Sequence, residues 1–284
     1  MASDAGVRAP GAGHAAADLA LASRRIGAMI RRHVYLLMGS WPRLLELAYW
    51  PTVQMILWGF ITKFLMGHTD FLAQAAGVFL SGVLLWDVLF RGQLSVSLLF
   101  MEEMYARHLG HLFVSPLRPY ELVISLFTMS VVRVLIGVGG AALLAIPIHG
   151  FSIFDALGPA LIAFFLNLLW FSWAMGLMIA ALVLRLGLGA ESLAWALIFL
   201  IQPLSGVYYP IATLPEWLQP VCWLLPSAPT FEGMRAVLFD GIFRTDLFVY
   251  AIALNLGWMA LAALVFLLLF RAARARGLLL QVGE

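Results

Sequence analysis

Long apolar stretches separated by shorter polar connections form the dominant pattern of this chain. A helix needs about 20 apolar residues to cross the hydrocarbon core of a membrane. Six apolar segments follow one another, at residues 44–66, 75–99, 122–148, 157–184, 192–207 and 248–270. Because unpaired backbone groups are costly in lipid, each segment is expected to be helical. The pattern predicts an all-α polytopic membrane protein with six transmembrane helices in a domain spanning residues 44–272.

A shorter segment ahead of the first apolar stretch alternates apolar residues with arginines. The apolar residues recur at helical spacing: Ile26, Met29, Ile30, Val34 and Leu37. The rest of the helix surface carries Arg24, Arg25, Arg31 and Arg32. The pattern predicts an amphipathic helix over residues 19–43 that lies in the membrane interface, with a solvated basic arm as the alternative. The Ala- and Gly-rich stretch 1–18 is expected to be disordered.

The connection between the second and third apolar segments is unusual. It opens with a charged, helix-forming run, Glu102–Leu109, which Gly110, Pro116 and Pro119 then interrupt. A short helix held between two spans is a natural contact for a soluble partner. The side chains that would make this contact are Glu102, Glu103, Tyr105, Arg107 and His108. The alternative is a solvated loop whose charges merely face water.

Another unusual connection precedes the last apolar segment. Prolines recur at positions 203, 210, 215, 220, 226 and 229, with aromatic residues between them. The stretch is too apolar for a free loop and too broken to span a membrane. It predicts a re-entrant helical hairpin at about 208–235, at the outer surface of the membrane, where irregular backbone must be buried or line a wet cavity. Its candidate residues are Tyr208, Tyr209, Pro210, Pro215, Trp217, Glu232 and Arg235.

Composition supports a lipid environment, and the basic residues predict an orientation. Charged residues make up 11% of the chain, against about 25% in soluble domains. If the N-terminus is cytoplasmic, the outer segments hold only Lys63, Arg235 and Arg244. The cytoplasmic segments then hold Arg8, Arg24, Arg25, Arg31, Arg32, Arg43, Arg107, Arg118, Arg185, Arg271, Arg274 and Arg276. This bias predicts that both termini, including a tail at 273–284, are cytoplasmic.

Three ionisable residues lie within or at the edge of the predicted spans. Asp87 and Arg91 are four residues apart and share a helix face, and Arg133 is a further possible partner for Asp87. A carboxylate inside a membrane is costly and often functional, for example as a proton relay. With two cations available for one anion, a structural ion pair is the competing interpretation. His108 and His111 lack further ligands nearby, so no metal site is expected.

Two regions of the chain resemble a known family. They are the run Pro203–Pro220 with Trp223–Pro226 and Glu232–Arg235, and the run Glu102–Gly110 with Ser115–Leu117 and Glu121–Leu122. The proline-rich region resembles the late region of ABC type-2 exporter permeases, and the charged region resembles their coupling helix. The resemblance extends from the interfacial helix to the sixth span. It implies that two permease copies or paralogues pair, and that each contacts an ATP-binding subunit through its coupling helix.

The resemblance also implies a function and a location. Such permeases move drugs, lipids and glycans outward, so the chain is expected to be the membrane subunit of an ABC exporter in the bacterial cytoplasmic (inner) membrane. The sequence has no Gly-x-x-x-x-Gly-Lys-Ser/Thr phosphate loop. We therefore expect no enzyme activity and no cofactor in this chain itself. ATP and Mg²⁺ would be held by a separate ATP-binding subunit, and nucleic acid is not an expected partner.

Two other functions compete with this one. A secondary transporter powered by protons would use Asp87 as its relay. A membrane-embedded enzyme would need a catalytic constellation, and Gly150–Ser152 is similar to a membrane serine protease nucleophile, but no His follows His149. Four tryptophans are candidates either for contact with an amphipathic substrate or for packing and headgroup anchoring: Trp50, Trp58, Trp86 and Trp195. The family geometry would place the cavity among spans one, two, five and the hairpin.

Overall fold

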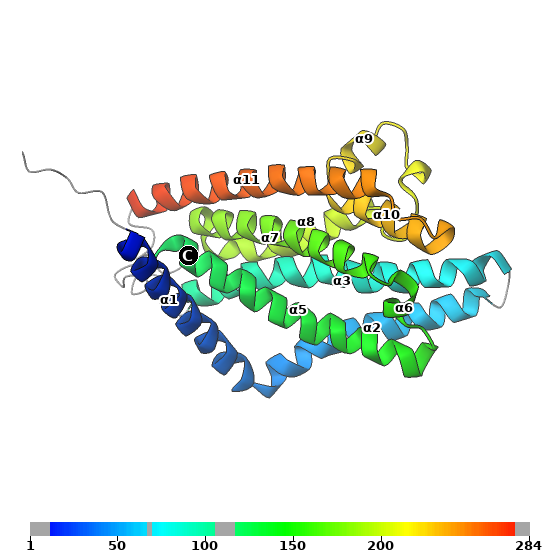
Figure 1. The fold of residues 1–284 in the computed structure, drawn as a ribbon, viewed down its shortest axis with the longest axis horizontal. Coiled ribbons are helices and arrows are strands. Elements are labelled where there is room, and N and C mark those ends of the chain that lie inside the picture. Colours follow the sequence, from blue (N-terminus) through cyan, green and yellow to red (C-terminus); the bar gives the residue numbers. More distant parts are fainter. Residues whose placement is uncertain (1–11, 67–69, 106–116, 276–284) are drawn as a thin grey trace, which may run out of the picture.

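Long helices that run roughly along one axis make up the computed structural model (Figure 1). It describes residues 12–66, 70–105 and 117–275. Within this part of the chain, five helices are long and apolar enough to cross a membrane: α2 (Trp41–Met66), α3 (Asp70–Tyr105), α5 (Pro119–His149), α7 (Ala160–Leu186) and α11 (Thr245–Ala275). The predicted all-α polytopic architecture is confirmed.

The fifth predicted span is a short helix that leads into the hairpin, as its short apolar segment indicated. The segment 192–207 corresponds to α8 (Glu191–Leu204), a helix of 14 residues that follows the 3₁₀ turn η1 (Gly187–Ala190). At 1.5 Å per residue α8 is about 21 Å long, which is short of the roughly 30 Å hydrocarbon core. The predicted count of six transmembrane helices is therefore corrected to five long helices and one shorter apolar helix within the described residues.

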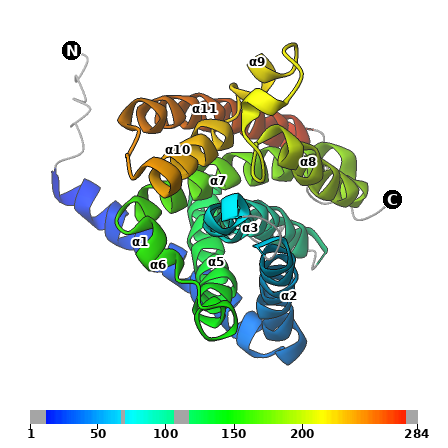
Figure 2. The same cartoon turned by 90° about the vertical axis from the view of Figure 1, so that its right-hand side faces the viewer.

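The helices surround α3, which lies at the centre when the bundle is viewed along its axis (Figure 2). In the most apolar part of each helix, 83% of α3 and 61% of α7 is buried inside the bundle. For α2 and α11 the buried share is only 17%. The outer helices therefore present most of their leucine and aromatic side chains to lipid. Because lipid is as apolar as these side chains, close packing and hydrogen bonds between helices must supply specificity.

Hydrogen bonds donated by side chains join α7 to its neighbours inside the bundle. Asn255 Nδ2 of α11 donates to the main-chain oxygen of Asn167 in α7, at 3.1 Å. Trp173 Nε1 of α7 donates to Ser130 Oγ of α5, at 2.7 Å. Each such bond contributes about 0.6 kcal/mol on average in a membrane. The helix α7 is thus connected through polar groups to two of the helices around it.

The N-terminal helix α1 (Ala12–Met38) lies obliquely across one end of the bundle and packs against α5 and α2 (Figure 1). It begins within the stretch 1–18 that was expected to be disordered, while residues 1–11 lie outside the described part. The predicted segment 19–43 is split, because the chain turns at Gly39 and Ser40 before α2 begins. Exposed Leu19, Tyr35 and Met38 give α1 an apolar outer surface.

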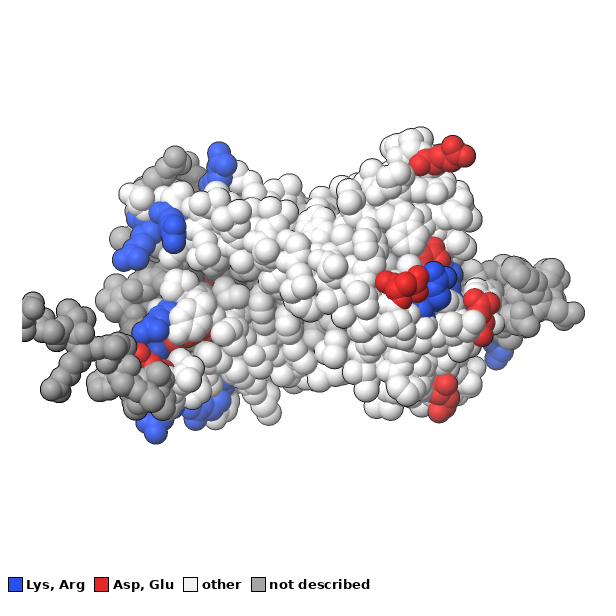
Figure 3. Space-filling model, turned by 45° about the horizontal axis from the view of Figure 1, so that its top comes forward, with Lys and Arg blue, Asp and Glu red and all other residues white. Residues whose placement is uncertain are grey.

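The segment before α11 is broken into short pieces, as its prolines predicted. They are η2 (Ile211–Thr213), α9 (Gln219–Cys222) and α10 (Ser227–Asp240). A further short helix, α6 (Ile153–Leu157), precedes α7 at the same end of the molecule. Lys and Arg side chains gather at the opposite end, where α1 lies, and an uncharged band separates the two (Figure 3). We call the end near α1 the basic end.

The contact between α3 and α7 depends on glycine. A Cβ atom at Gly176 would lie 2.6 Å from Val96 Cβ and 3.0 Å from the main-chain oxygen of Gln93. Gly176→Ala should therefore lower the free energy of unfolding by about 1–3 kcal/mol through overpacking. Thermal unfolding in detergent, followed by tryptophan fluorescence, measures the change.

Gly257→Ala in α11 is the matched control, because a Cβ atom there meets nothing within 4 Å. This substitution should leave stability unchanged or raise it slightly, since Ala favours helix more than Gly. Equal melting temperatures for the two variants would contradict the proposed close contact.

Candidate functional site

The end of α3 carries three of the residues predicted to contact a partner. The sequence predicted a separate short helix from Glu102, after a span ending at residue 99, but α3 continues without a break to Tyr105. Its last turns contain no Gly or Pro, and Met and Glu are good helix formers. Glu102, Glu103 and Tyr105 therefore belong to the spanning helix itself. Arg107 and His108 lie outside the described residues.

Glu103 is buried against α1 instead of facing outward. Its side chain is 2% exposed and forms an ion pair with Arg32, and its Oε1 lies 3.1 Å from His33 Nε2. His33 is itself 1% exposed, and its Nδ1 lies 2.9 Å from the main-chain oxygen of Met29. Glu103 thus lies in a contact within the chain, where a soluble partner would not reach it.

Glu102, the preceding residue of the same helix, has a different environment. It is 35% exposed, and its Oε1 lies 3.7 Å from Nη1 of Arg43, which is 43% exposed. An ion pair of this length and exposure contributes little to stability. Of the two neighbouring glutamates, Glu102 is the one whose carboxylate is accessible at the basic end.

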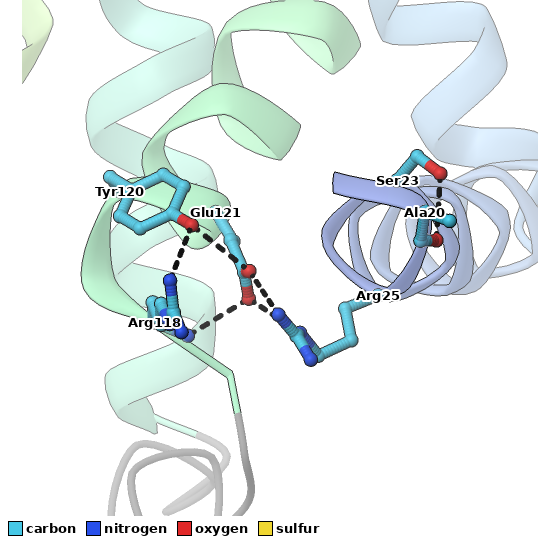
Figure 4. Close-up of polar contacts among 6 residues, drawn as sticks. All are labelled: Ala20, Ser23, Arg25, Arg118, Tyr120 and Glu121. Atoms are coloured by element: carbon cyan, nitrogen blue, oxygen red, sulfur yellow. Dashed lines mark hydrogen bonds and ion pairs between the residues drawn. The ribbon is translucent and has the colours of Figure 1, made fainter. Parts of the chain in front are cut away.

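Another buried carboxylate joins α1 to the start of α5 (Figure 4). Glu121 is 0% exposed and accepts two hydrogen bonds from Arg25, at 2.9 Å from Nε and 2.6 Å from Nη2. It also accepts one from the main-chain N–H of Arg118, at 3.0 Å, which satisfies a donor before the first turn of the helix. The hydrogen bonds to Glu121 raise the pKa of Arg25 above its ordinary value.

These two clusters hold α1 on the ends of α3 and α5. Sequence reasoning assigned Arg25 and Arg32 to the polar surface of an interfacial helix and did not identify His33 or Glu121 as their neighbours. The partners are 96 residues apart for Arg25 and 71 for Arg32. A helix-spacing argument relates only residues three or four apart. The one available signal was the presence of acidic residues at the ends of two otherwise apolar segments.

The charges inside the membrane do not form the ion pair that the sequence favoured. Asp87 is 6% exposed, its Oδ2 has no hydrogen-bond partner, and no described basic side chain lies within 4 Å of it. Arg91 lies one turn further along α3. It lines a cavity of about 150 Å³ with Arg133, Arg43 and two glutamates, Glu46 and Glu102.

Asp87 instead lines a different cavity, of about 200 Å³, between α2, α3 and α8. Its described walls are mainly aromatic: Trp50, Trp86, Phe90, Trp195, Phe199 and Tyr208. Trp58, the fourth predicted tryptophan, stacks on Tyr208 with ring centroids 4.6 Å apart. The two cavities share Trp50, Phe90 and Trp195 in their walls, so they lie next to each other along α3. We call the two together the lateral groove.

The predicted external hairpin is organised by Glu232 and Arg235 of α10. Glu232 Oε1 accepts from the main-chain N–H of Ile211 at 2.7 Å and lies 2.9 Å from Arg235 Nη2. Arg235 Nη1 donates to the main-chain oxygen of Gly206 at 2.6 Å. Gly206 has a φ of +60°, which favours glycine. The two charged residues therefore fix the turn that follows α8.

Other predicted hairpin residues lie around this turn. Tyr209 donates to the main-chain oxygen of Pro203 at 2.8 Å, and Pro210 precedes η2. Pro215 precedes the turn before α9, and Trp217 is 75% exposed. The last helix also contacts the hairpin, through hydrogen bonds from Tyr250 to the main-chain oxygen of Trp223 and from Trp258 to that of Leu224, both at 2.9 Å.

Comparison with known families agrees with this geometry. The model of the ABC-2 type transporter family matches residues 21–239, which include most of α1, the lateral groove and the Glu232–Arg235 turn. The chain belongs to the ABC-2 type transporter family. As a member it is a multi-pass membrane protein and a permease component of an ABC transporter, a class that works with an ATP-binding partner. A search among curated proteins found no significant match.

Glu102 and Glu103 offer a test of the contact between α1 and α3 in this ABC-2 permease. Glu103→Gln removes the charge that faces Arg32 and His33 in a buried place, so it should lower the free energy of unfolding by about 2 kcal/mol. Glu102→Gln, the same change one residue earlier, should cost less than about 1 kcal/mol. Chemical unfolding in detergent measures both, and equal losses would contradict the assigned role of Glu103.

Proposed function

We propose that the chain is the permease subunit of an ABC exporter and that a separate subunit binds and hydrolyses ATP with Mg²⁺. The observation that carries the proposal is the ABC-2 family match over residues 21–239. The sequence contains no phosphate loop, which is consistent with ATP hydrolysis by a separate polypeptide. The alternative, a proton-driven transporter that uses Asp87, has no comparable support from the family.

The basic end is the proposed contact with the ATP-binding subunit. The arginine-rich end of a membrane protein faces the cytoplasm by the positive-inside rule, and α1 begins and α11 ends there (Figure 1). This orientation puts the termini in the cytoplasm and the Glu232–Arg235 turn outside, for a chain in the bacterial inner membrane. The segment 102–109, whose first residues form the end of α3 at the basic end, is the proposed coupling segment.

Continuity of α3 supplies a route from the coupling segment to the lateral groove. Glu102 and Asp87 lie on one uninterrupted helix, about 22 Å apart along its axis at 1.5 Å per residue. A displacement of the end of α3 by the ATP-binding subunit would move the wall of the groove with it. Because α1 is bound to the ends of α3 and α5, it would move as part of the same body.

The lateral groove is the proposed substrate path, and α2 and α8 are the proposed dimer surface. Trp50, Phe199 and Trp195 are 53%, 56% and 38% exposed along the rim of the groove. Another permease copy or a paralogue packed there would cover these rings and enclose the path. The apolar and aromatic walls fit an amphipathic, lipid, glycan or drug-like molecule that leaves near the external hairpin.

The coupling role of segment 102–109 can be tested with the permease and its ATP-binding subunit reconstituted together. Glu102→Ala combined with Arg107→Ala should lower ATP-driven transport by roughly tenfold while ATP hydrolysis continues. Transport and hydrolysis are measured in the same proteoliposomes. Arg244→Ala, an exposed change outside the basic end, is the control and should leave both rates unchanged. Wild-type coupling in the double variant would contradict the assignment.

A separate test distinguishes ATP-driven from proton-driven transport. Proteoliposomes that contain the complex are given ATP, and a protonophore then collapses the proton gradient. We expect transport to continue, because ATP hydrolysis supplies the free energy. Transport that stops with the protonophore, and that a proton gradient restores without ATP, would favour the alternative based on Asp87.

A further inference from the structure

Asp87 is a buried carboxyl group that lines a cavity. Arg91, one turn further along α3, attracts it electrostatically, but no described basic side chain lies within 4 Å of it. The side chain of Asp87 is 6% exposed, and Oδ2 makes no hydrogen bond with any described group. Burying an ionised carboxylate without compensation costs several kcal/mol, so such a group usually has a cation or several donors beside it. Glu103 and Glu121, the other buried carboxylates described above, both contact arginine. Asp87 instead lines the cavity of about 200 Å³.

Aromatic rings form most of the wall around this carboxyl group. Phe90 contacts both Trp195 and Phe199, with ring centroids 5.9 Å apart in each case, and Trp195 and Phe199 stack at 6.5 Å. Trp50, Trp86 and Tyr208 are the other aromatic residues of the wall, which also contains Gln54, Val83 and Gln202. Ring faces attract cations, and groups of aromatic rings bind quaternary ammonium ions in proteins. In its ionised form, a carboxyl group among such rings adds a negative charge to the same site.

The other charged groups nearby lie in the neighbouring compartment of the lateral groove. Arg91 and Arg133 line the cavity of about 150 Å³, together with Arg43, Glu46 and Glu102. The described residues that line the cavity of Asp87 include no basic side chain. Tyr208 is the other ionisable residue there, and burial raises its pKa to about 12, so the phenol stays neutral. Asp87 therefore sets the sign of the charge in its compartment.

We propose that the Asp87 compartment binds the cationic head of a lipophilic amine or quaternary ammonium compound. This inference rests on the proposed export function and gives that function a substrate class. Ligand sites for drug-sized molecules usually enclose about 300–1,000 Å³. A compartment of about 200 Å³ accommodates a head group, and the apolar remainder of the molecule extends along the open groove. The head group supplies the direct cationic contact that Asp87 lacks among the described residues.

Binding to the full-length permease in lipid nanodiscs tests this proposal. The probes are benzyltrimethylammonium and phenylmethanesulfonate, which have one ring each and opposite charge. Quenching of tryptophan fluorescence reports occupancy, since Trp50, Trp86 and Trp195 line the compartment. The cation should bind at least tenfold more tightly than the anion. Asp87→Asn should remove that preference, while Asp87→Glu should retain most of it.

Asp155→Asn is the matched control, because it makes the same chemical change on the exposed surface of α6. It should bind the cation as the wild type does. Equal binding of cation and anion by the wild type would overturn the proposal without any variant, so a failure of Asp87→Asn to fold leaves the test decisive. Wild-type affinity in a folded Asp87→Asn variant would overturn it as well.

The binding assay contains no ATP-binding subunit, so its outcome is separate from that of the export function. If the cation binds through Asp87 but the reconstituted complex shows no ATP-driven transport of any compound, the exporter proposal fails and the site remains. If ATP-driven transport of neutral or anionic compounds is found while the cation fails to bind, the exporter proposal stands and the cation site is overturned.

Discussion

Two buried carboxylates at the basic end determine how the N-terminal helix sits on the bundle. Glu103 and Glu121 are almost completely shielded from water, and each would be costly to keep ionised without a counter-charge. Arg32 and Arg25 provide those charges from α1. The helix is therefore held by specific pairing as well as by its apolar side chains, and its binding site exists only when α3 and α5 lie side by side. The docking of α1 thus depends on correct assembly of the first spans.

The helix α3 carries both Glu103, at the basic end, and Asp87, in the lateral groove, and the two carboxyl groups have opposite environments. At the basic end, the Glu103 carboxylate of α3 forms an ion pair with Arg32 of α1. Further along, the lateral groove leaves a carboxyl group among aromatic rings. Because α3 is the most buried of the long helices, neither end can rotate without disturbing α5 and α7. We therefore expect the lateral groove and the basic end to move together.

Much of this architecture could be predicted from the sequence because lipid imposes a simple rule. Apolar length and proline spacing identified the long helices and the broken hairpin, since both depend on local properties of the chain. The pairs Arg25–Glu121 and Arg32–Glu103 could not be predicted, because they depend on how distant helices meet. The environment of Asp87 could not be predicted for the same reason: Arg91 attracts it electrostatically but forms no ion pair with it within 4 Å. Arg91 and Asp87 share a helix face because they are four residues apart, but their side chains line different compartments.

The hydrogen bonds from Tyr250 and Trp258 give the external hairpin an unexpected dependence on the last helix. Both donors belong to α11, which has few other polar contacts and mostly faces lipid. Their acceptors are main-chain oxygens on the short pieces between α9 and α10. If the hairpin shifts to release a molecule, α11 must tilt with it or give up both bonds. Bilayer thickness, which acts on the tilt of a peripheral helix, would then influence how readily the hairpin moves.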